Sequence, residues 1–130
     1  MTSSSAITKE PRRTPITSSR PKVAVVHTSP ESVLDDIATA MSLAEYQEVL
    51  PKELATLLKI NISWQFYYPA CSTSPWQLEG VIKKLQTDGY QDLIATHNGT
   101  VVVDAREGEV NNKHQVVQEK YGLETVHLES

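Results

Sequence analysis

Polar residues in this sequence follow apolar runs at the positions where parallel strands would end. Lys59 and Asn61 lie at the end of one apolar run, and Thr96 and His97 follow another. In open parallel sheets, ligands bind beyond the carboxyl ends of the strands. A lysine charge with amide, hydroxyl and imidazole hydrogen bonds suits a small anion such as a phosphate or a carboxylate. The structural alternative is that each of these groups only caps a loop where its strand leaves the core.

A long segment, residues 61–75, adds hydroxyl groups and aromatic rings to this edge. Its sequence is NISWQFYYPACSTSP, so Ser72 and Thr73 precede a predicted helix, whose free backbone N–H groups favour an anion. Capping of that helix is the alternative role of these hydroxyls. The aromatic side chains suit a packed lid, a subunit contact or a stacking platform. The predicted ligand-binding residues are therefore Lys59, Asn61, Ser72, Thr73 and His97, and no residue is assigned a catalytic role.

Nucleophilic and metal chemistry have less specific signals. Cys71 lies close to a predicted helix amino end, which lowers the pKa of a thiol, but a small buried hydrophobic side chain is the commoner role of a lone cysteine. One cysteine cannot hold an iron–sulfur cluster, so we expect no cofactor within this chain. No metal site is predicted, because the sequence separations of the four histidines match no compact ligand motif, although three of the four lie at predicted strand ends. The four are His27, His97, His114 and His127.

The elements that position these groups alternate between strands and helices. Strands that alternate with helices form a parallel sheet with right-handed crossovers. We predict an α/β fold of three layers, with a mostly parallel sheet of about four strands and crossover helices, and with an incomplete sheet as an alternative. Residues 98–103 are either a hairpin turn with a return strand or a loop with a short edge strand. The predicted strands are Val23–Val26, Leu54–Ile62, Leu93–Ala95 and Thr125–Leu128.

The predicted helices have recognisable ends. The helix after the long segment begins with Ser74 and Pro75, has the capping-box partner Gln77, and ends at Gly89. A first helix follows the Ser29–Pro30 pair, and a short third helix runs from a cap at Asn112 to Gly122. The apolar faces of the first two helices are formed by Leu34, Ile37, Ala38, Met41 and Ala44, and by Leu78, Val81, Ile82 and Leu85.

Charge divides the 130-residue chain into two parts. Residues 1–21 carry four basic residues and one acidic residue, a net charge of +3, whereas the rest carries −7. The first part is rich in serine, threonine and proline and poor in apolar side chains, so we expect a disordered extension. The alternatives are that residues 1–21 act as an organelle transit peptide or bind nucleic acid loosely. Residues 22–130 form the predicted single α/β domain, whose acidity argues against nucleic acid as a partner.

Cysteine content and hydropathy indicate the cellular compartment in which we expect this protein. A single cysteine excludes an internal disulfide framework and fits a reducing compartment. No apolar run approaches the roughly 20 residues that cross a bilayer, and the first residues lack the apolar core of a secretory signal. We therefore expect a cytoplasmic protein without a membrane partner.

Three runs of this sequence resemble the amino-terminal part of the domain of unknown function 362 family. They are LLKINIS, ACSTSPWQLEGVIKKLQTDGY and DLIATHN, and the similarity covers about residues 22–122. Lys59 and Asn61 match a strand that ends in Lys-Pro-Asn in the family, and Thr73 and Pro75 match a Thr-His-Pro-like turn. Gly89 matches the family's helix end. The chain departs from the family at Ile60, which replaces the proline, and at Ser74, which replaces the histidine.

The resemblance implies an uncharacterised α/β domain. Members of this family are longer than this chain, and some carry a ferredoxin-like iron–sulfur segment, so the resemblance implies a fragment or a split version of a larger protein. We expect a domain that binds a small anionic ligand at the carboxyl ends of the strands. The alternative is an interaction module that docks onto the rest of an iron–sulfur-associated protein, onto another partner chain, or onto a copy of itself.

Overall fold

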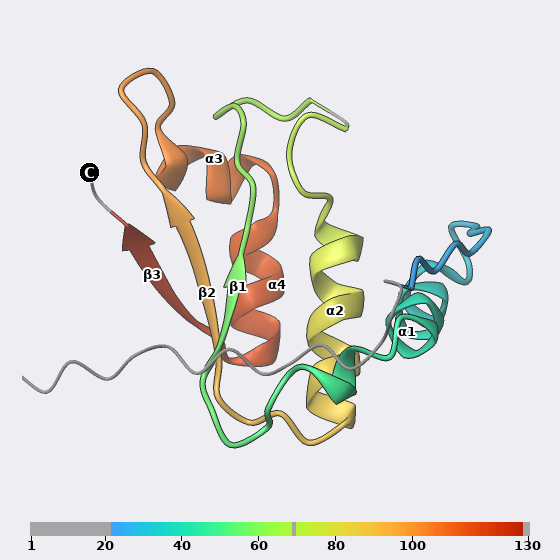
Figure 1. Cartoon of the computed structure of the whole chain (residues 1–130). Helices are drawn as coiled ribbons and strands as arrows, with labels where there is room; N and C mark the ends of the chain where they lie inside the picture. The colour runs from blue at the N-terminus through green and yellow to red at the C-terminus, as the bar shows by residue number, and fades with distance from the viewer. Residues whose placement is uncertain (1–21, 69, 129–130) are drawn as a thin grey trace, which may run out of the picture.

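The computed structural model describes residues 22–68 and 70–128 of the chain. The predicted extension, residues 1–21, lies outside the described residues. Figure 1 follows the course of the chain from α1 to β3. In chain order the elements are α1 (Val33–Leu43), the 3-10 helix η1 (Tyr46–Glu48), β1 (Thr56–Lys59), α2 (Pro75–Thr87), β2 (Leu93–Asn98), α3 (Ala105–Asn111), α4 (His114–Tyr121) and β3 (Glu124–Leu128).

The three strands form one parallel sheet in the order β1-β2-β3. This arrangement confirms the predicted α/β class and the parallel sheet. Thr56 pairs with Leu93 at the start of β1, and Ile94 pairs with Glu124 at the start of β3. The carboxyl ends of all three strands therefore lie at one edge of the domain, beside α3 and the long segment that leads to α2 (Figure 1).

The predicted strand at Val23–Val26 is wrong, and the described sheet has three strands instead of about four. Residues 22–29 have no regular secondary structure, and Val23 and Val25 are 85% and 81% exposed. Apolar β-branched content predicts a strand only where a neighbouring strand completes its hydrogen bonds. No described strand pairs with this segment, so the sequence pattern alone misled the prediction.

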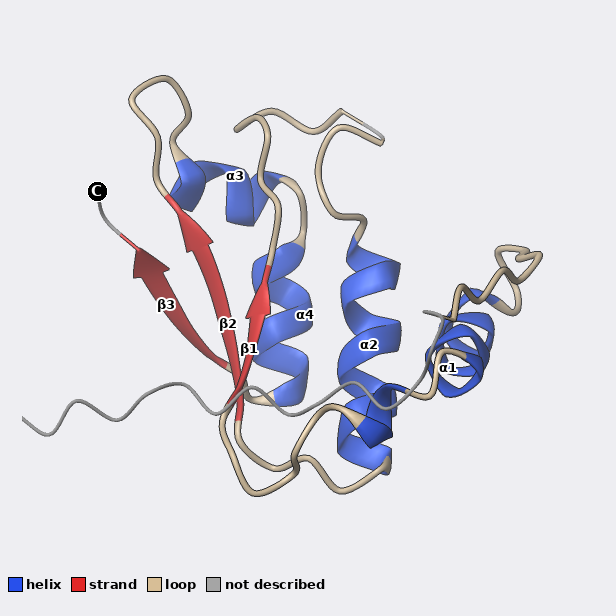
Figure 2. Cartoon of the chain, in the orientation of Figure 1, coloured by secondary structure: helices blue, strands red, loops and turns tan. Residues whose placement is uncertain are grey.

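Helices are found on one face of the sheet, as Figure 2 shows for α4 behind β1 and β2. On that face Ala95 is fully buried, and Leu78, Ile82 and Leu85 of α2 belong to the same core. The other face carries Leu57, which is 64% exposed. The predicted layers are thus arranged differently, because α1 packs against α2 and not against the second face of the sheet.

The packing of α1 on α2 depends on Gly80. A Cβ atom at this position would lie 2.8 Å from Cδ1 of Ile37 on α1. Carbon atoms that are not bonded to each other are essentially never found this close. The two helices therefore approach each other at a point where glycine fits and a larger residue does not. Ile37 belongs to the apolar face that was predicted for the first helix.

The ends of the helices match the prediction in part. The second helix begins at Pro75, but the side chain of Ser74 makes no capping hydrogen bond. Gly122 ends α4 with a φ of 66°, the left-handed conformation that favours glycine. Asn112 ends α3 and does not cap α4, which begins at His114. Residues 98–103 form a loop with one isolated bridge between Thr100 and Val103 and no return strand.

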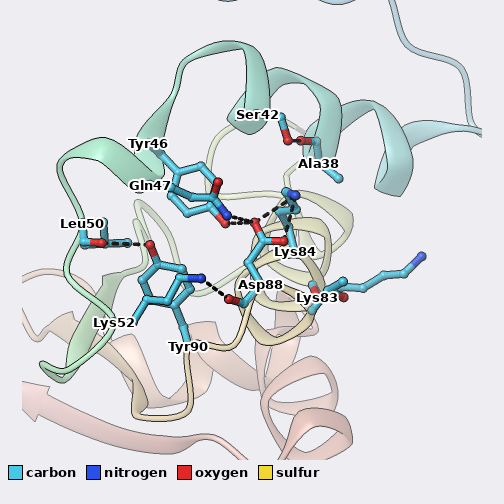
Figure 3. A network of polar contacts seen from close by, with 11 residues as sticks. Ala38, Ser42, Tyr46, Gln47, Leu50, Lys52, Lys83, Lys84, Asp88 and Tyr90 are labelled. Atoms are coloured by element: carbon cyan, nitrogen blue, oxygen red, sulfur yellow. Dashed lines mark hydrogen bonds and ion pairs between the residues drawn. The ribbon is translucent and has the colours of Figure 1, made fainter.

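A polar network joins the end of α2 to the segment after α1, at the amino ends of the strands (Figure 3). Tyr46 Oη and Gln47 Nε2 both donate to Oδ2 of Asp88, over 2.5 and 2.7 Å. Lys84, one turn earlier, pairs with the same carboxylate over 2.9 Å, and Lys52 Nζ donates to the Asp88 carbonyl. The hydrogen bond from Tyr46, followed by that from Lys84, lowers the pKa of the Asp88 carboxyl. This network fixes the end of the domain that is opposite the strand carboxyl ends.

No described helix is long and apolar enough to cross a membrane.

Candidate metal centre

Two histidines lie side by side at the carboxyl ends of β2 and β3. The parallel register pairs His97 with His127. Side chains at one register position point to the same face of a sheet, here the face that carries the helices. The two ring centroids are 4.5 Å apart, and the ring planes meet at 81°. The fold thus brings together two imidazoles that are 30 positions apart in the sequence.

A carboxylate from α3 lies between the two imidazoles. The Nε2 atoms of His97 and His127 lie 3.2 and 3.1 Å from the same oxygen, Oε2 of Glu109. Because an ionised carboxylate only accepts hydrogen bonds, each Nε2 carries the hydrogen in this arrangement, and a metal could bind Nε2 only with that hydrogen moved to Nδ1. The metal-ligating atoms of the three residues all lie within 4.8 Å of one another.

The position of Glu109 is determined by local features of α3. Asp104 caps this helix, since its side chain accepts a hydrogen bond from the Glu107 N–H over 2.9 Å. A Cβ atom at Gly108 would lie 2.5 Å from Cγ2 of Ile62 and 3.3 Å from Cα of Gln65. Only glycine at this position lets α3 lie directly against the segment after β1, which places the next residue, Glu109, over the histidines.

The cluster is largely buried. His97 is 1% exposed and Glu109 is 7% exposed, whereas the His127 side chain is 22% exposed. Burial by itself would raise the pKa of the Glu109 carboxyl, but hydrogen bonds from His97 and His127 outweigh it and lower that pKa. The carboxylate therefore stays ionised, as a metal ligand must be. Because His127 is the most exposed of the three side chains, solvent reaches the cluster from its side.

A third histidine extends the polar interior toward the long segment. His114, the first residue of α4, is fully buried, and its Nε2 lies 2.5 Å from the Thr73 carbonyl oxygen. Burial lowers the pKa of His114 and favours its neutral form. Among the described residues, Nδ1 of His114 and Nδ1 of His97 have no hydrogen-bond partner. Two buried ring nitrogens in this region therefore make no hydrogen bond to a described residue.

Two cavities adjoin the cluster. One, of about 280 Å³, is lined by both His97 and His127, together with Gly99, Val103, Asp104, Ala105 and Arg106. The other, of about 340 Å³, has Glu109 and His127 in its wall, together with residues of α3, α4 and β3. Groups bound to the cluster therefore have space on two sides.

The five predicted ligand-binding residues separate into two groups. Asn61, Ser72 and Thr73 meet at the base of the long segment, where Thr73 Oγ1 accepts from the Asn61 N–H over 3.0 Å and Ser72 Oγ accepts from the Ser63 N–H over 3.1 Å. The Thr73 N–H also donates to the Asn61 carbonyl. These bonds hold the two ends of the segment together, which is the structural role that we kept as an alternative.

Lys59 and His97 are not brought together. Lys59 is the last residue of β1 and pairs with Thr96, so its side chain belongs to the face of the sheet opposite His97. Its Nζ donates to the neighbouring Ile60 carbonyl over 3.2 Å. His97 instead lies in the separate cluster with Glu109 and His127.

Sequence reasoning missed Glu109 and the pairing of His97 with His127. A signal for the pairing was present, because both histidines lie at the ends of predicted strands and neighbouring parallel strands end at the same edge. Glu109 had no comparable signal, since residues 104–111 follow a loop whose structure was left open. Cys71, the other candidate, is exposed, so the buried hydrophobic role expected for it is wrong.

Comparison of the chain with protein-family models, curated proteins and solved structures found no match. The resemblance to the domain of unknown function 362 family therefore stays a prediction from the quoted motifs.

Proposed function

We propose that this chain binds a divalent transition-metal ion through His97, Glu109 and His127. The observation that supports the proposal is the approach of two imidazole nitrogens, from neighbouring strands, to one buried carboxylate oxygen. Ligand atoms that each lie about 2.1 Å from one ion are themselves about 3.0–3.4 Å apart, which is close to the two separations from Glu109 Oε2 found here.

The donor set favours some metals over others. Two imidazoles and one carboxylate suit zinc, iron(II) and cobalt(II), whereas magnesium and calcium take mainly oxygen ligands. Three protein ligands leave at least one position open, as in catalytic zinc sites, while structural zinc sites have four protein ligands. A metal ion at such a site polarises a bound water or a bound oxygen ligand.

A purely structural role is the competing explanation. Two histidine hydrogen bonds to Glu109 would hold α3 on the sheet without any metal. However, three polar side chains at the edge of a small core cost desolvation energy that apolar side chains of similar size would avoid. The two adjoining cavities are also more than attachment of α3 requires.

Metal titration of the full chain tests the proposal. Chelator-treated protein should bind one Zn²⁺ or Co²⁺ per chain in calorimetry, and bound Co²⁺ should give visible absorption bands of low-symmetry coordination. Glu109→Gln and His127→Gln should each weaken binding by at least about 100-fold, because each removes a direct ligand. His27→Gln is the matched control, since His27 is exposed and lies outside the cluster. Equal affinity in all four proteins would overturn the proposal.

A second candidate function is association with another copy of the chain through the uncovered face of the sheet. It is supported by three exposed apolar side chains on that face, Leu57, Val126 and Leu128. Both outer strands of the sheet also have a free edge among the described residues. Sedimentation should then show a concentration-dependent dimer that Leu57→Lys weakens. A monomer at every concentration would exclude this second candidate.

A further inference from the structure

We infer that two copies of this chain associate by strand exchange, in which residues 22–27 of each copy pair with the open edge of β1 in the other copy. Residues 22–27 are called the exchange segment below. The exchange uses neither the metal site nor the uncovered face of the sheet, so it is independent of both candidate functions.

The exchange segment has the composition of a strand but pairs with nothing in its own chain. The backbone of residues 23–26 makes no hydrogen bond to a described residue. Val23 and Val25 are 85% and 81% exposed. β-branched side chains favour a strand once a neighbouring strand is present. The segment is therefore not a strand within one chain, but it forms one where another chain supplies the neighbour.

The exchange segment is loosely held against α1. A cavity of about 350 Å³ is lined by Ala24, Val25 and Val26 together with residues of α1. Well-packed interiors leave few voids larger than a water molecule. The start of the segment is held by an ion pair between Lys22 and Glu45, whose side chains are 50% and 40% exposed. Exposed ion pairs contribute little stability, so little free energy opposes the release of the segment.

The outer edge of β1 has backbone groups available for a new strand. Thr56 and Ile60 donate their N–H groups to carbonyl oxygens of the β2 side, over 2.8 Å in each case. Because alternate residues of a strand direct their backbone groups to the same side, Leu57 and Lys59 direct theirs to the outer edge. No described strand lies beyond this edge, and such an edge is a template for pairing with another chain.

The turn before α1 directs the exchange segment away from the sheet of its own chain. The Ser32 N–H donates to the Ser29 carbonyl over 3.2 Å, and Ser32 Oγ donates to Oδ2 of Asp36 over 2.6 Å. Figure 1 shows the segment, in blue, beyond α1, with α2 between α1 and β1. Pairing with its own β1 would require the segment to pass both helices and to break this turn, whereas pairing with a second copy leaves the turn in place.

Reciprocal exchange closes the assembly at two copies. Each copy has one exchange segment and one open β1 edge among its described residues, so two copies satisfy each other. The expected product is therefore a dimer with two identical strand pairings.

Proline substitutions test the acceptor and the donor separately. Lys59→Pro removes an N–H group from the outer edge of β1 and no bond to β2, and proline is tolerated at such edge positions. Lys59→Ala is its matched control, because it keeps that N–H group. In the exchange segment, Val25→Pro and Val26→Pro remove N–H groups that a strand directs to opposite sides. One of them therefore removes a bond to β1, and the other is its control.

The experiment is sedimentation velocity of the full chain after chelator treatment, with far-ultraviolet circular dichroism to show that each variant is folded. The parent chain should form a concentration-dependent dimer. Lys59→Pro should raise the dissociation constant at least about tenfold, because each dimer contains the lost bond twice. One of Val25→Pro and Val26→Pro should do the same, while Lys59→Ala stays at the parent value.

Mixing two defective variants tests the exchange itself. Lys59→Pro keeps an intact exchange segment, and the weakened variant of residue 25 or 26 keeps an intact β1 edge. A mixture of the two should associate more strongly than either alone, because one intact segment then meets one intact edge. A mixture no stronger than its components would overturn the inference.

Two further outcomes identify a different partner for these surfaces. A monomeric parent chain whose amides at residues 23–26 are protected from hydrogen exchange would place the segment on its own β1 and overturn the inference. A dimer that survives Lys59→Pro but is lost in Leu57→Lys would belong to the uncovered face of the sheet and would also overturn it. All of these measurements are made without metal, so none of them decides whether His97, Glu109 and His127 bind an ion.

Discussion

His97 and His127 occupy the same register position on neighbouring parallel strands, with their ring centroids 4.5 Å apart. The backbone hydrogen bonds of the sheet, and not the side chains themselves, determine this approach. The two imidazoles are therefore held before any ligand arrives, which lowers the conformational entropy lost on metal binding. Glu109 completes the set from a separate helix, so its placement depends on how α3 packs.

Metal binding should stabilise the folded chain. At a free Zn²⁺ concentration 100 times the dissociation constant, a ligand that binds only the folded state adds about 2.7 kcal/mol to the free energy of unfolding. Thermal unfolding followed by circular dichroism should show a higher midpoint with Zn²⁺ than with Mg²⁺. The shift should disappear in Glu109→Gln and remain in His27→Gln. An equal shift in both variants would place the stabilising metal elsewhere.

Gly108→Ala should weaken metal binding without changing any ligand. Its methyl group would meet Ile62 at 2.5 Å and the Gln65 backbone at 3.3 Å, so α3 must move away from the segment after β1. Overpacking of this kind typically costs about 1–3 kcal/mol of stability, and it displaces Glu109 from the histidines. Calorimetric Zn²⁺ titration and chemical denaturation measure the two effects.

Gly99→Ala is the matched control for that change, since a Cβ atom there meets nothing within 4 Å. If Gly108→Ala lowers stability but leaves Zn²⁺ affinity at the parent value, the packing of α3 does not determine the position of Glu109.

The sequence was sufficient for the elements that have strong local signals. The helix from Pro75 to Thr87 has a first-turn proline and regular apolar spacing, and it was predicted almost to the residue. The apolar runs that became β1, β2 and β3 were also recognised. Val23–Val26 failed because a strand is completed by its neighbour, and the local sequence contains no information about whether that neighbour exists.

The site was harder to predict than the fold. His97 was selected because it follows a strand, but its partners come from α3 and β3, and only strand register and helix packing reveal them. Ser72 and Thr73 were predicted to bind a ligand together with Asn61, yet their hydroxyls accept backbone N–H bonds from the other end of the segment. A hydroxyl that binds a ligand and one that closes a loop have the same sequence signal.

Asp88 should make the stability of the domain depend on acid pH. Its carboxyl pKa is lowered in the folded state by Tyr46 and Lys84, so the ionised group stabilises the fold above its unfolded pKa, about 3.9. This contribution is lost as pH falls from that value through the lower folded pKa. Asp88→Asn should therefore cost about 1–3 kcal/mol at neutral pH and reduce the further loss in acid.

Urea denaturation at several pH values measures this dependence. Asp35→Asn is the matched control, because the Asp35 side chain pairs with Lys83 but is 84% exposed. It should change stability by less than about 1 kcal/mol. A parent protein and an Asp88→Asn variant with parallel pH profiles would show that the Tyr46 network does not stabilise the fold through its charge.

Lys59→Ala should leave Zn²⁺ binding unchanged, although the prediction from sequence grouped Lys59 with His97 in one site. The register places Lys59 opposite Thr96, on the face of the sheet away from His97, and Lys59 is not part of the cluster of His97, Glu109 and His127. Solvent screens the remaining long-range repulsion between the lysine charge and a metal ion, so the dissociation constant of Zn²⁺ should stay within about twofold. Glu109→Gln, which removes a direct ligand, should raise this constant at least about 100-fold in the same calorimetric titration. If Lys59→Ala instead changes Zn²⁺ affinity as strongly as Glu109→Gln does, the metal does not bind at the cluster beside His97.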